Sequence, residues 1–357
     1  MSGAKPGPAR KRPPTLGPLR QLTVSFVSAT VTLVVLILVV VAAALWLYDG
    51  PGPAAAHGLG STVVVLRPGA GLTEIASSLR DGGVIRSPAV FEAAAQVTGF
   101  ARHLKAGEYE FPTRASLAQV MGKIRRGEVV RHMITIPEGL TSEAAVDILM
   151  DTPYLAGAAP IPAEGAILPE TYQVLRGEDR GEVLQRMIAA RDALLRALWA
   201  QRAPDLPITT PEQAVTLASI IEKETGVPDE RPKVAAVMVN RLRQHIRLQS
   251  DPTIIYGLTR GKPLGRGIRA SELTGYTPYN TYLIDGLPPT PICNPGRASL
   301  AAALDPAHTA DLYFVADGTG GHAFSATLEQ HQKNVDRWRA IEAKAAGQAA
   351  TSPKRSG

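Results

Sequence analysis

The chain of 357 residues contains a single cysteine, Cys293, and only 5% aromatic residues. One cysteine excludes a disulfide within the chain and a zinc site made of several thiolates. It also gives little support for a cysteine nucleophile, because a lone cysteine in a proline-flanked loop is more often inert. The chemistry is therefore expected to come from carboxylates, amides, hydroxyls and imidazoles.

Several catalytic signatures are missing as well. There is no HExxH, GxSxG or P-loop motif, so metalloprotease, α/β-hydrolase and nucleotide-hydrolase functions lack support. The seven histidines are scattered, and only His322 and His331 merit consideration as a pair. Because no acidic cluster accompanies them, we expect neither a metal ion nor another cofactor.

The net charge of +6 is unevenly distributed. Five of these charges come from lysine and arginine residues within the first 20 positions, which contain no acid. The rest of the chain is nearly neutral and offers no electrostatic basis for binding nucleic acid. We therefore expect no nucleic-acid partner, and we interpret residues 1–21 as a basic tail.

Residues 22–48 form an uncharged run dominated by Val, Leu and Ala. The run exceeds the roughly 20 residues that span a bilayer and the about 7 to 15 apolar residues of a cleavable signal peptide. Arg20 precedes it, and Trp46 and Tyr48 lie near its end, as interfacial residues do. The sequence predicts a single-pass helix in the cell (inner) membrane, with residues 1–21 in the cytoplasm and the remaining chain outside.

Composition indicates how the outer part is divided. Residues 49–61 are rich in Gly, Pro and Ala and are typical of a linker. Residues 62–135 predict a small α+β module, with strands at 63–66, 107–111 and 133–136 and helices at 72–79, 89–97 and 117–124. Within it, VLRPGAGLTEIASSLRDGGVI resembles the start of a LysM-type glycan-binding module. The alternative is a generic small domain that spaces the following part from the membrane.

Residues 136–345 predict a mainly helical domain with short strands, so the overall fold class is α+β. Helices are expected near 140–150, 180–201, 211–224, 229–245 and 328–345, with a hairpin at 312–316 and 322–325. Residues 246–296 are dense in Pro, Gly, Tyr and Asn, and a loop region this long inside a compact domain is usually functional or disordered. Its several tyrosines argue against disorder. The last residues, 346–357, are expected to form a disordered tail.

The helix that ends before Gly226 carries the candidate catalytic acid, Glu224. With each residue placed at about 100° around the helix axis, Glu224 falls between Ile220 and Ile221 on the apolar side. An ionised carboxylate is costly there, so its pKa is expected to rise toward the range that a general acid needs. Glu222 instead falls among small residues on the side expected to be polar.

A purely structural role for Glu224 remains open at this point. A buried glutamate is often paired with an arginine, and Arg231 and Arg241 follow on the next expected helix. The nearby loop region supplies hydroxyls, amides and aromatic rings, a set that suits a sugar substrate with many hydroxyls. We take six of these residues as candidates to bind substrate: Gln249, Ser250, Asp251, Tyr279, Asn280 and Asn294.

A series of motifs then occurs in a fixed order: ASIIEKET, ER, VNRL, LQSDPTIIYG, YNTY, GLPPTPICNPG and YFVADGTGGHAF. Together they resemble the MltG (YceG-like) family of endolytic murein transglycosylases. The resemblance covers about residues 62–345 and implies a membrane-bound lyase. Such an enzyme cleaves nascent peptidoglycan between N-acetylmuramic acid and N-acetylglucosamine and leaves a 1,6-anhydromuramic end. Association with peptidoglycan synthases is implied by the resemblance alone.

The family's catalytic acid corresponds to the second glutamate of the EKE motif, Glu224. The implied mechanism has Glu224 protonate the glycosidic oxygen and then accept a proton from the muramic C6 hydroxyl, which attacks the anomeric carbon. Two alternatives remain. One is a lysozyme-like hydrolase with Asp251 as nucleophile or base, since such enzymes use two carboxylates. The other is a non-catalytic glycan-binding scaffold tethered to the membrane.

Overall fold

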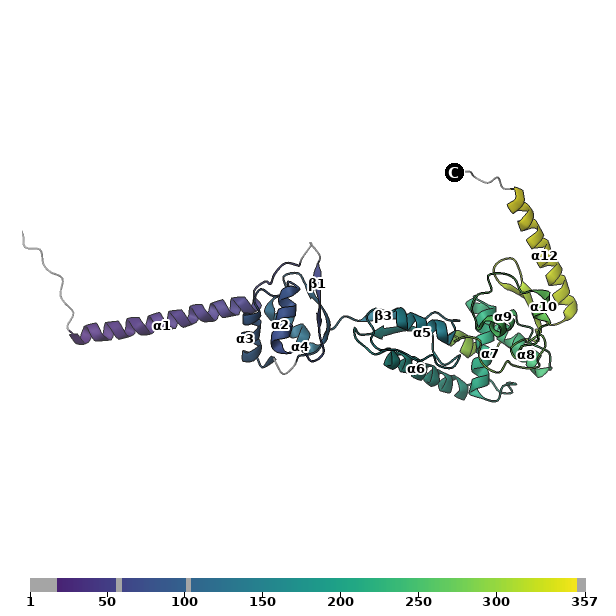
Figure 1. Cartoon of the computed structure of the whole chain (residues 1–357), viewed down its shortest axis with the longest axis horizontal. Helices are drawn as coiled ribbons and strands as arrows, with labels where there is room; N and C mark the ends of the chain where they lie inside the picture. Colours follow the sequence, from purple (N-terminus) through teal and green to yellow (C-terminus); the bar gives the residue numbers. More distant parts are fainter. Residues whose placement is uncertain (1–17, 56–59, 101–103, 352–357) are drawn as a thin grey trace, which may run out of the picture. The chain divides into compact units, whose positions relative to one another are not determined.

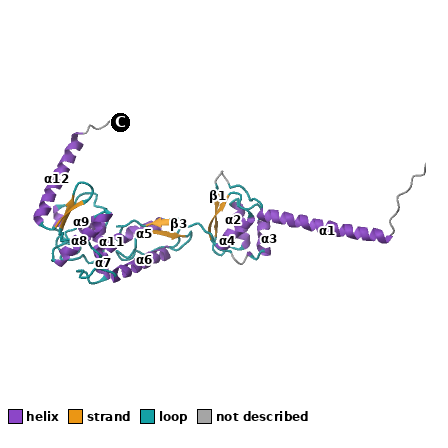
Figure 2. Ribbon diagram, turned by 180° about the vertical axis from the view of Figure 1, so that it is seen from behind, coloured by secondary structure: helices purple, strands orange, loops and turns teal. Residues whose placement is uncertain are grey.

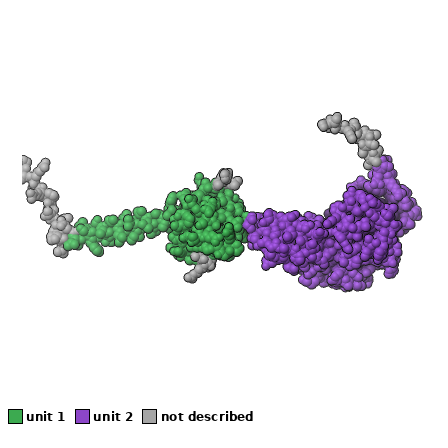
Figure 3. All heavy atoms as spheres, viewed as in Figure 1, with its two compact units in different colours: residues 1–130 green, residues 131–357 purple. Residues whose placement is uncertain are grey.

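The computed structural model describes residues 18–55, 60–100 and 104–351. The chain divides into two compact units, Met1–Val130 and Arg131–Gly357, shown in green and purple in Figure 3. Helices predominate, and the described strands pair into two-stranded antiparallel sheets (Figure 2). The mixture of helices and short strands agrees with the expected α+β class.

The first unit begins with a long apolar helix that leads into a small folded module (Figure 1). Within the described residues, one helix is long and apolar enough to cross a membrane, with a span of Leu22–Asp49 and a mean hydropathy of 2.9. The elements in chain order are α1 (Pro18–Asp49), β1 (Ser61–Leu66), α2 (Leu72–Asp81), α3 (Pro88–Val97), β2 (Gly107–Pro112) and α4 (Leu117–Arg126).

The module's core lies between one face of its sheet and its helices. Along β1, Val64 and Leu66 are buried whereas Val63 and Val65 are exposed, which is the alternation of a strand with one covered face. β1 and β2 pair antiparallel from Ser61 opposite Pro112 to Leu66 opposite Gly107. Ser87 caps α3 and Ser116 caps α4, each by accepting a hydrogen bond from a backbone N–H of the first turn.

The segment after α1 is attached to the module. The amide of Gly52 donates to the carbonyl of Arg114, and the amide of Arg114 donates to the carbonyl of Pro53. The expected linker of residues 49–61 therefore begins with a stretch packed on the module, while residues 56–59 lie outside the described part. Most of the expected basic tail, residues 1–17, also lies outside it, and α1 starts at Pro18.

The second unit is larger. Its elements are β3 (His132–Thr135), α5 (Ser142–Asp151), β4 (Thr171–Val174), α6 (Arg180–Ala200), α7 (Pro211–Glu224), the 3₁₀ turn η3 (Pro228–Glu230), α8 (Arg231–Arg243), α9 (Asp251–Thr259), α10 (Ala270–Leu273), α11 (Arg297–Leu304), β5 (Tyr313–Ala316), β6 (His322–Ser325) and α12 (Leu328–Thr351).

Two apolar clusters hold this unit together. One packs β3 and β4 against α5 and α6 through residues such as Ile134, Leu149 and Met187. The other surrounds α7 with α8 and α11, and Phe314 and Phe324 of the β5–β6 hairpin pack against it. The helix that carries Glu224 thus lies at the centre of the larger core.

Three sequence expectations need correction. The strand expected at 133–136 does not complete the first module, because β3 pairs with β4 from His132 opposite Val174 to Thr135 opposite Thr171. The region 246–296 is not a continuous loop, since it contains α9 and α10. The tail expected from residue 346 is helical as far as Thr351, where α12 ends; residues 352–357 lie outside the described part.

Candidate functional site

Helix α7 has clear start and stop signals. The Thr210 side chain accepts a hydrogen bond from the amide of Gln213, and Pro211 occupies the first helical position. At the other end, Thr225 is extended, and its hydroxyl accepts from the amide of Val227. Glu224 is therefore the last helical residue, where its side chain can project beyond the packed helix.

The helix is enclosed on every side, and this corrects the sequence interpretation. Every residue from Ala214 to Ile221 is buried, including Ala218 and Ser219 on the side expected to be polar. The Ser219 hydroxyl accepts a hydrogen bond from the amide of Ile292, so the loop before α11 covers this side. Small residues allow such close packing, and a helical wheel based on hydrophobicity takes them for an exposed face.

The carboxylate of Glu224 lies in a crowded environment. Burial is the main cause that raises its pKa, the negative charge of Asp251 raises it further, and His322 and Arg241 oppose the rise. The Ser250 hydroxyl donates to Oε1 of Glu224 at 2.5 Å and also favours the ionised form. The net effect is a raised pKa, as a general acid near neutral pH requires.

Glu222 is also enclosed, but it has different partners. Its side chain is 6% exposed and its Oε1 lies 3.7 Å from Nη2 of Arg231. Its other carboxylate oxygen accepts a hydrogen bond from the amide of Gly296 at 2.9 Å. Arg231, which was considered as a partner of Glu224, thus forms its ion pair with Glu222.

Arg241, the second arginine considered as a partner of Glu224, donates its hydrogen bonds mainly to backbone carbonyls. Its guanidinium donates to the carbonyls of Leu312 and Leu248 at 2.7 and 2.9 Å, and to Oε1 of Gln249 at 3.3 Å. It thereby fixes the segment that leads to Ser250. Its positive charge acts on Glu224 only as a weaker influence on the pKa.

Three of the six predicted substrate-binding residues lie together at the start of α9. Ser250 contacts Glu224, whereas Gln249 and Asp251 on either side of it are exposed. Oδ1 of Asp251 accepts a hydrogen bond from the Tyr282 hydroxyl at 2.7 Å. Burial and this carboxylate raise the pKa of Tyr282, so the phenol stays protonated. The structure therefore places a hydroxyl on Glu224, and an exposed amide and an exposed second carboxylate on the residues that flank Ser250.

The backbone at this point is held in an uncommon conformation. Gln249 has φ of 53°, in the left-handed region that non-glycine residues seldom adopt. Its amide donates to the carbonyl of Thr281, and the amide of Ser250 donates to the Thr281 hydroxyl. This local arrangement directs the Ser250 hydroxyl toward Glu224, and residues 279–282 act as its support.

The other three predicted residues are buried among protein partners. The Tyr279 hydroxyl lies 2.8 Å from that of Thr290, and its ring packs edge-on against Tyr256 at 4.9 Å. Asn280 is completely buried, and its amide donates to the carbonyls of residues 273 and 275 at 3.1 and 2.8 Å. The structure therefore gives Tyr279 and Asn280 roles in shaping the loop, away from open surface.

Asn294 is likewise completely buried. Its Nδ2 donates to the carbonyl of Leu140 at 3.1 Å, and its Oδ1 accepts from the amide of Ile167 at 3.0 Å. These bonds join the loop before α11 to the segments on either side of α5. Both polar atoms of the Asn294 side chain therefore have protein partners.

Sequence reasoning missed one further pair beside this site. Nδ1 of His322 on β6 lies 2.7 Å from Oε2 of Glu230, and the amide of His322 donates to Oε1 of the same carboxylate. The Thr225 hydroxyl, next to Glu224, also contacts Oε2 of Glu230 at 3.4 Å. Both residues occur in the quoted motifs, but no periodicity connects positions so far apart in the chain.

Neither the cysteine nor a metal cluster adds to this chemistry. Cys293 is completely buried, its thiol contacts the carbonyl of Ser219, and burial strongly raises its pKa. Among the described residues, no group of three or more His, Cys, Asp or Glu side chains is arranged to hold a metal ion.

Known proteins share this sequence pattern. An endolytic murein transglycosylase of Bacillus subtilis is 29% identical over 303 residues, covering 76% of this chain and 82% of that protein. One of Streptococcus pneumoniae is 27% identical over 317 residues, covering 75% of this chain and 56% of that protein, so the chain spans just over half of its length. The crystal structure of a putative YceG-like protein from Listeria monocytogenes is 28% identical, with a TM-score of 0.48 over 77% of this chain and 98% of that chain.

The family assignment does not depend on any one of these relatives. The YceG-like family model matches residues 64–337, which include most of the first module and the whole region around Glu224. Because this match covers well over half of the sequence, the chain belongs to the YceG-like family.

Proposed function

We propose that the protein is an endolytic peptidoglycan lytic transglycosylase, a lyase, with Glu224 as its catalytic acid and base. Two relatives named endolytic murein transglycosylase support the activity. The observation that carries the assignment of the residue is the Glu224 carboxyl at the end of α7, with a raised pKa, bound by Ser250 and next to exposed polar groups.

The reaction requires only one carboxyl group. Protonated Glu224 donates its proton to the oxygen that links N-acetylmuramic acid to N-acetylglucosamine, and the bond from the anomeric carbon to that oxygen breaks. The C6 hydroxyl of the same muramic residue then forms a bond to the anomeric carbon and returns its proton to Glu224. No water is consumed, and the strand ends in a 1,6-anhydro ring. An internal nucleophile thus removes the need for a second carboxylate.

The neighbouring residues have supporting roles in this proposal. Ser250 orients the carboxyl group of Glu224, while exposed Gln249 and Asp251 offer hydrogen bonds to sugar hydroxyls and N-acetyl groups. Tyr279, Asn280 and Asn294 act indirectly, because they hold the loops that present these groups. Asp251 also keeps a hydrolytic alternative open, since an exposed carboxylate lies next to the acid and glycosidases that use water employ two carboxylates.

Product analysis tests the activity and the acid together. Uncrosslinked glycan strands are incubated with the full-length protein in detergent, and the fragments are analysed by mass spectrometry. We expect internal fragments with anhydro ends from the wild type and a loss of at least about 10²-fold in rate for Glu224→Gln, the usual contribution of a general acid. Glu222→Gln is the matched control, since it alters the other enclosed glutamate of the same helix.

The alternative outcomes are distinct. Fragments with reducing ends, abolished by Asp251→Asn, would replace the lyase with a hydrolase. Anhydro fragments that persist undiminished in Glu224→Gln would exclude Glu224 as the acid. An absence of cleavage in the wild type, together with binding of glycan strands, would favour the non-catalytic scaffold.

The location of the enzyme forms part of the same proposal. The apolar span Leu22–Asp49 supports a single membrane anchor, and the basic residues before it support a cytoplasmic N-terminus. The catalytic unit would then lie outside the cell (inner) membrane, where nascent glycan strands are made, and peptidoglycan synthases are the proposed partners. Protease protection in membrane vesicles of known orientation tests the placement, and cleavage of the second unit from the cytoplasmic side would contradict it.

The first module is proposed to bind glycan strands. The LysM-type resemblance of residues 65–85 supports this role, and in the structure these residues form the end of β1, the following turn and α2. The measurement is a pull-down with insoluble peptidoglycan by the full-length protein carrying Glu224→Gln, compared with a variant that also lacks residues 61–126. Equal retention of both proteins would remove the binding role and leave a spacer.

A further inference from the structure

The first unit contains an apolar groove where α1 meets the module. Val41, Ala44 and Leu45 of α1 form one wall, and Ala93, Ala94 and Val97 of α3 form the other. Val97 is 88% exposed, the highest value among the exposed large apolar side chains of the described residues. In Figure 1, α3 lies beside the end of α1, while β1 lies on the opposite side of the module. We call this surface the juxtamembrane groove.

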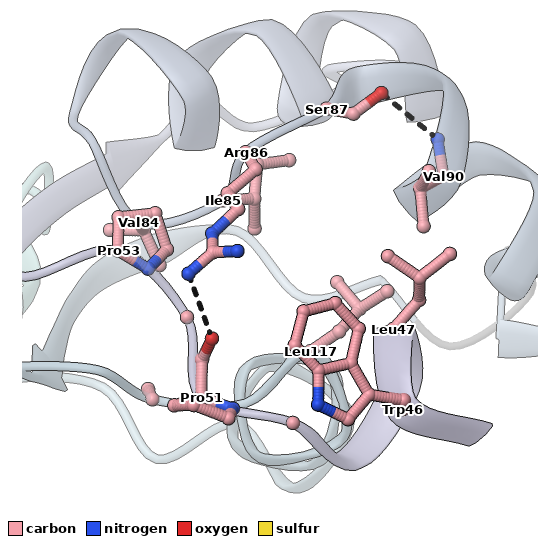
Figure 4. A pocket seen from close by; sticks show the side chains of 13 residues that line it. Trp46, Leu47, Pro51, Pro53, Val84, Ile85, Arg86, Ser87, Val90 and Leu117 are labelled. Atoms are coloured by element: carbon pink, nitrogen blue, oxygen red, sulfur yellow. Dashed lines mark hydrogen bonds between the residues drawn. The ribbon is translucent and has the colours of Figure 1, made fainter. Parts of the chain in front are cut away.

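The end of α1 is attached to the module without a free hinge in the described residues. The half-buried Tyr48 packs against the module's core, and the amide of Gly50 donates to the carbonyl of Trp46 at 2.8 Å. The following residues bind the module through Gly52 and Pro53, as described above. Arg86 adds a hydrogen bond from Nη2 to the carbonyl of Pro51 at 3.3 Å, visible in Figure 4. The position of α3 is therefore set by the direction of α1.

The length of α1 determines where the groove lies. The span Leu22–Asp49 has 28 residues and is about 42 Å long, at about 1.5 Å per residue. The hydrocarbon core of a bilayer is about 30 Å thick, which is crossed by about 20 residues. A span that enters the core near Leu22 leaves it near Val41, the residue at which the groove begins. The excess length lies beside α3.

We propose that the juxtamembrane groove lies in the interfacial region of the outer leaflet, where lipid headgroups and the first methylenes of the acyl chains contact Ala93, Ala94 and Val97 of α3. The apolar surface of the groove is continuous with the apolar surface of α1, so the same lipids contact both. Trp46 and Arg86 line the neighbouring pocket in Figure 4, at the height expected for lipid headgroups. The module is thereby held on the membrane surface, with one helix partly immersed.

This proposal rests on the proposed membrane anchor, and the experiment separates the two. An environment-sensitive fluorophore is attached to the full-length protein in nanodiscs through Val97→Cys, Val63→Cys or Leu36→Cys, and lipids with a spin label near the headgroup or deeper in the acyl chain are added. Native Cys293 is completely buried, and the wild type treated with the reagent measures any background. Val63 is the matched control, an exposed valine of the same module on β1.

We expect the shallow spin label to quench the fluorophore at Val97 strongly and the one at Val63 weakly, with a shift to shorter wavelength only at Val97. The probe at Leu36 should be quenched most by the deeper label. Quenching at Leu36 with equal, weak quenching at Val97 and Val63 would overturn this inference and leave the anchor intact. Absence of quenching at Leu36 would overturn the anchor itself. Rapid formation of a disulfide-linked dimer by the unlabelled Val97→Cys variant with an added oxidant, at a site where Val63→Cys forms none, would assign the groove to a second copy of the chain and overturn the lipid assignment.

Discussion

Glu230 and His322 join the two structural elements that flank Glu224. The carboxylate of Glu230 belongs to the 3₁₀ turn after α7, and it accepts hydrogen bonds from both the backbone and the ring of His322 on β6. The β5–β6 hairpin is thereby fixed to the end of the helix that carries the acid.

This pair predicts an acid-sensitive contribution to stability. Burial tends to raise the pKa of Glu230, but the hydrogen bonds from His322 outweigh it and lower the pKa below its ordinary value. A lowered pKa in the folded state contributes stability above the ordinary pKa, and this contribution is lost as the pH falls through the lowered value. We expect Glu230→Gln to lower the melting temperature at neutral pH and to match the wild type in strongly acidic buffer. Glu329→Gln, on the exposed face of α12, is the control. A difference in melting temperature between Glu230→Gln and the wild type that is the same at both pH values would refute the linkage.

Ser250 predicts a shift in the pH dependence of activity. Its hydroxyl donates to the ionised carboxylate of Glu224 and so lowers the pKa, against the larger effect of burial. Ser250→Ala should therefore raise the pKa of Glu224 further. Because the acid must be protonated to act, the decline in kcat/KM at alkaline pH should move to higher pH. Ser271→Ala, at an exposed position on α10, should leave the profile unchanged, and a shift to lower pH in Ser250→Ala would contradict the geometry.

The two glutamates of α7 should affect stability in opposite directions. The raised pKa of Glu224 means that the folded state disfavours its ionised form, so stability declines as the pH rises from the ordinary pKa to the raised one. Glu224→Gln should therefore raise the melting temperature at neutral and alkaline pH and have little effect in acid. Glu222→Gln should lower stability by about 1 kcal/mol, because Arg231 would lose one of its two carboxylate partners and keep only the half-exposed Glu138. Denaturant unfolding of both variants beside the wild type measures this contrast. Changes of the same sign in the free energy of unfolding of the two variants would refute it.

Asn294 is predicted to act on folding. Replacement by alanine leaves the amide of Ile167 enclosed without a partner, which costs about 2 kcal/mol, whereas the carbonyl of Leu140 keeps its hydrogen bond from the backbone amide of residue 294. We expect a lower unfolding midpoint in denaturant, whereas KM for glycan strands stays close to that of the wild type under conditions where the variant is folded. A large rise in KM without loss of stability would instead place Asn294 in contact with substrate.

The sequence allowed good prediction of features that depend on local pattern. The periodicity around Leu217 and Ile220 located α7, and short strand-like runs located β1 and, on either side of DGTGG, the β5–β6 hairpin. Features that depend on distant partners were missed or misplaced. α9 and α11 are short and lie among Pro and Gly residues, so they have weak periodic signals. β3 looked like part of the first module because nothing local indicates that its partner is β4.

The same distinction applies to the site. Glu224 could be selected because an acid on an apolar helix face is unusual in itself. The burial of Glu222 could not be predicted, because it depends on the loop around Gly296 and on Arg231. The roles of the loop amides were also ambiguous, since the sequence of an irregular region is the same whether a polar side chain binds substrate or stabilises a turn. Only the hydrogen bonds of Asn280 and Asn294 distinguish the two cases.

The enclosure of α7 has a consequence for protein engineering. Ala214, Ala218 and Ser219 are completely buried against neighbouring segments, so almost any larger side chain there would displace a neighbour. Variant libraries directed at this helix would consist mostly of misfolded proteins. The stretch 260–278 is largely exposed and lies between α9 and the supporting loop. It offers freedom to vary residues of the same unit while the acid itself keeps its position.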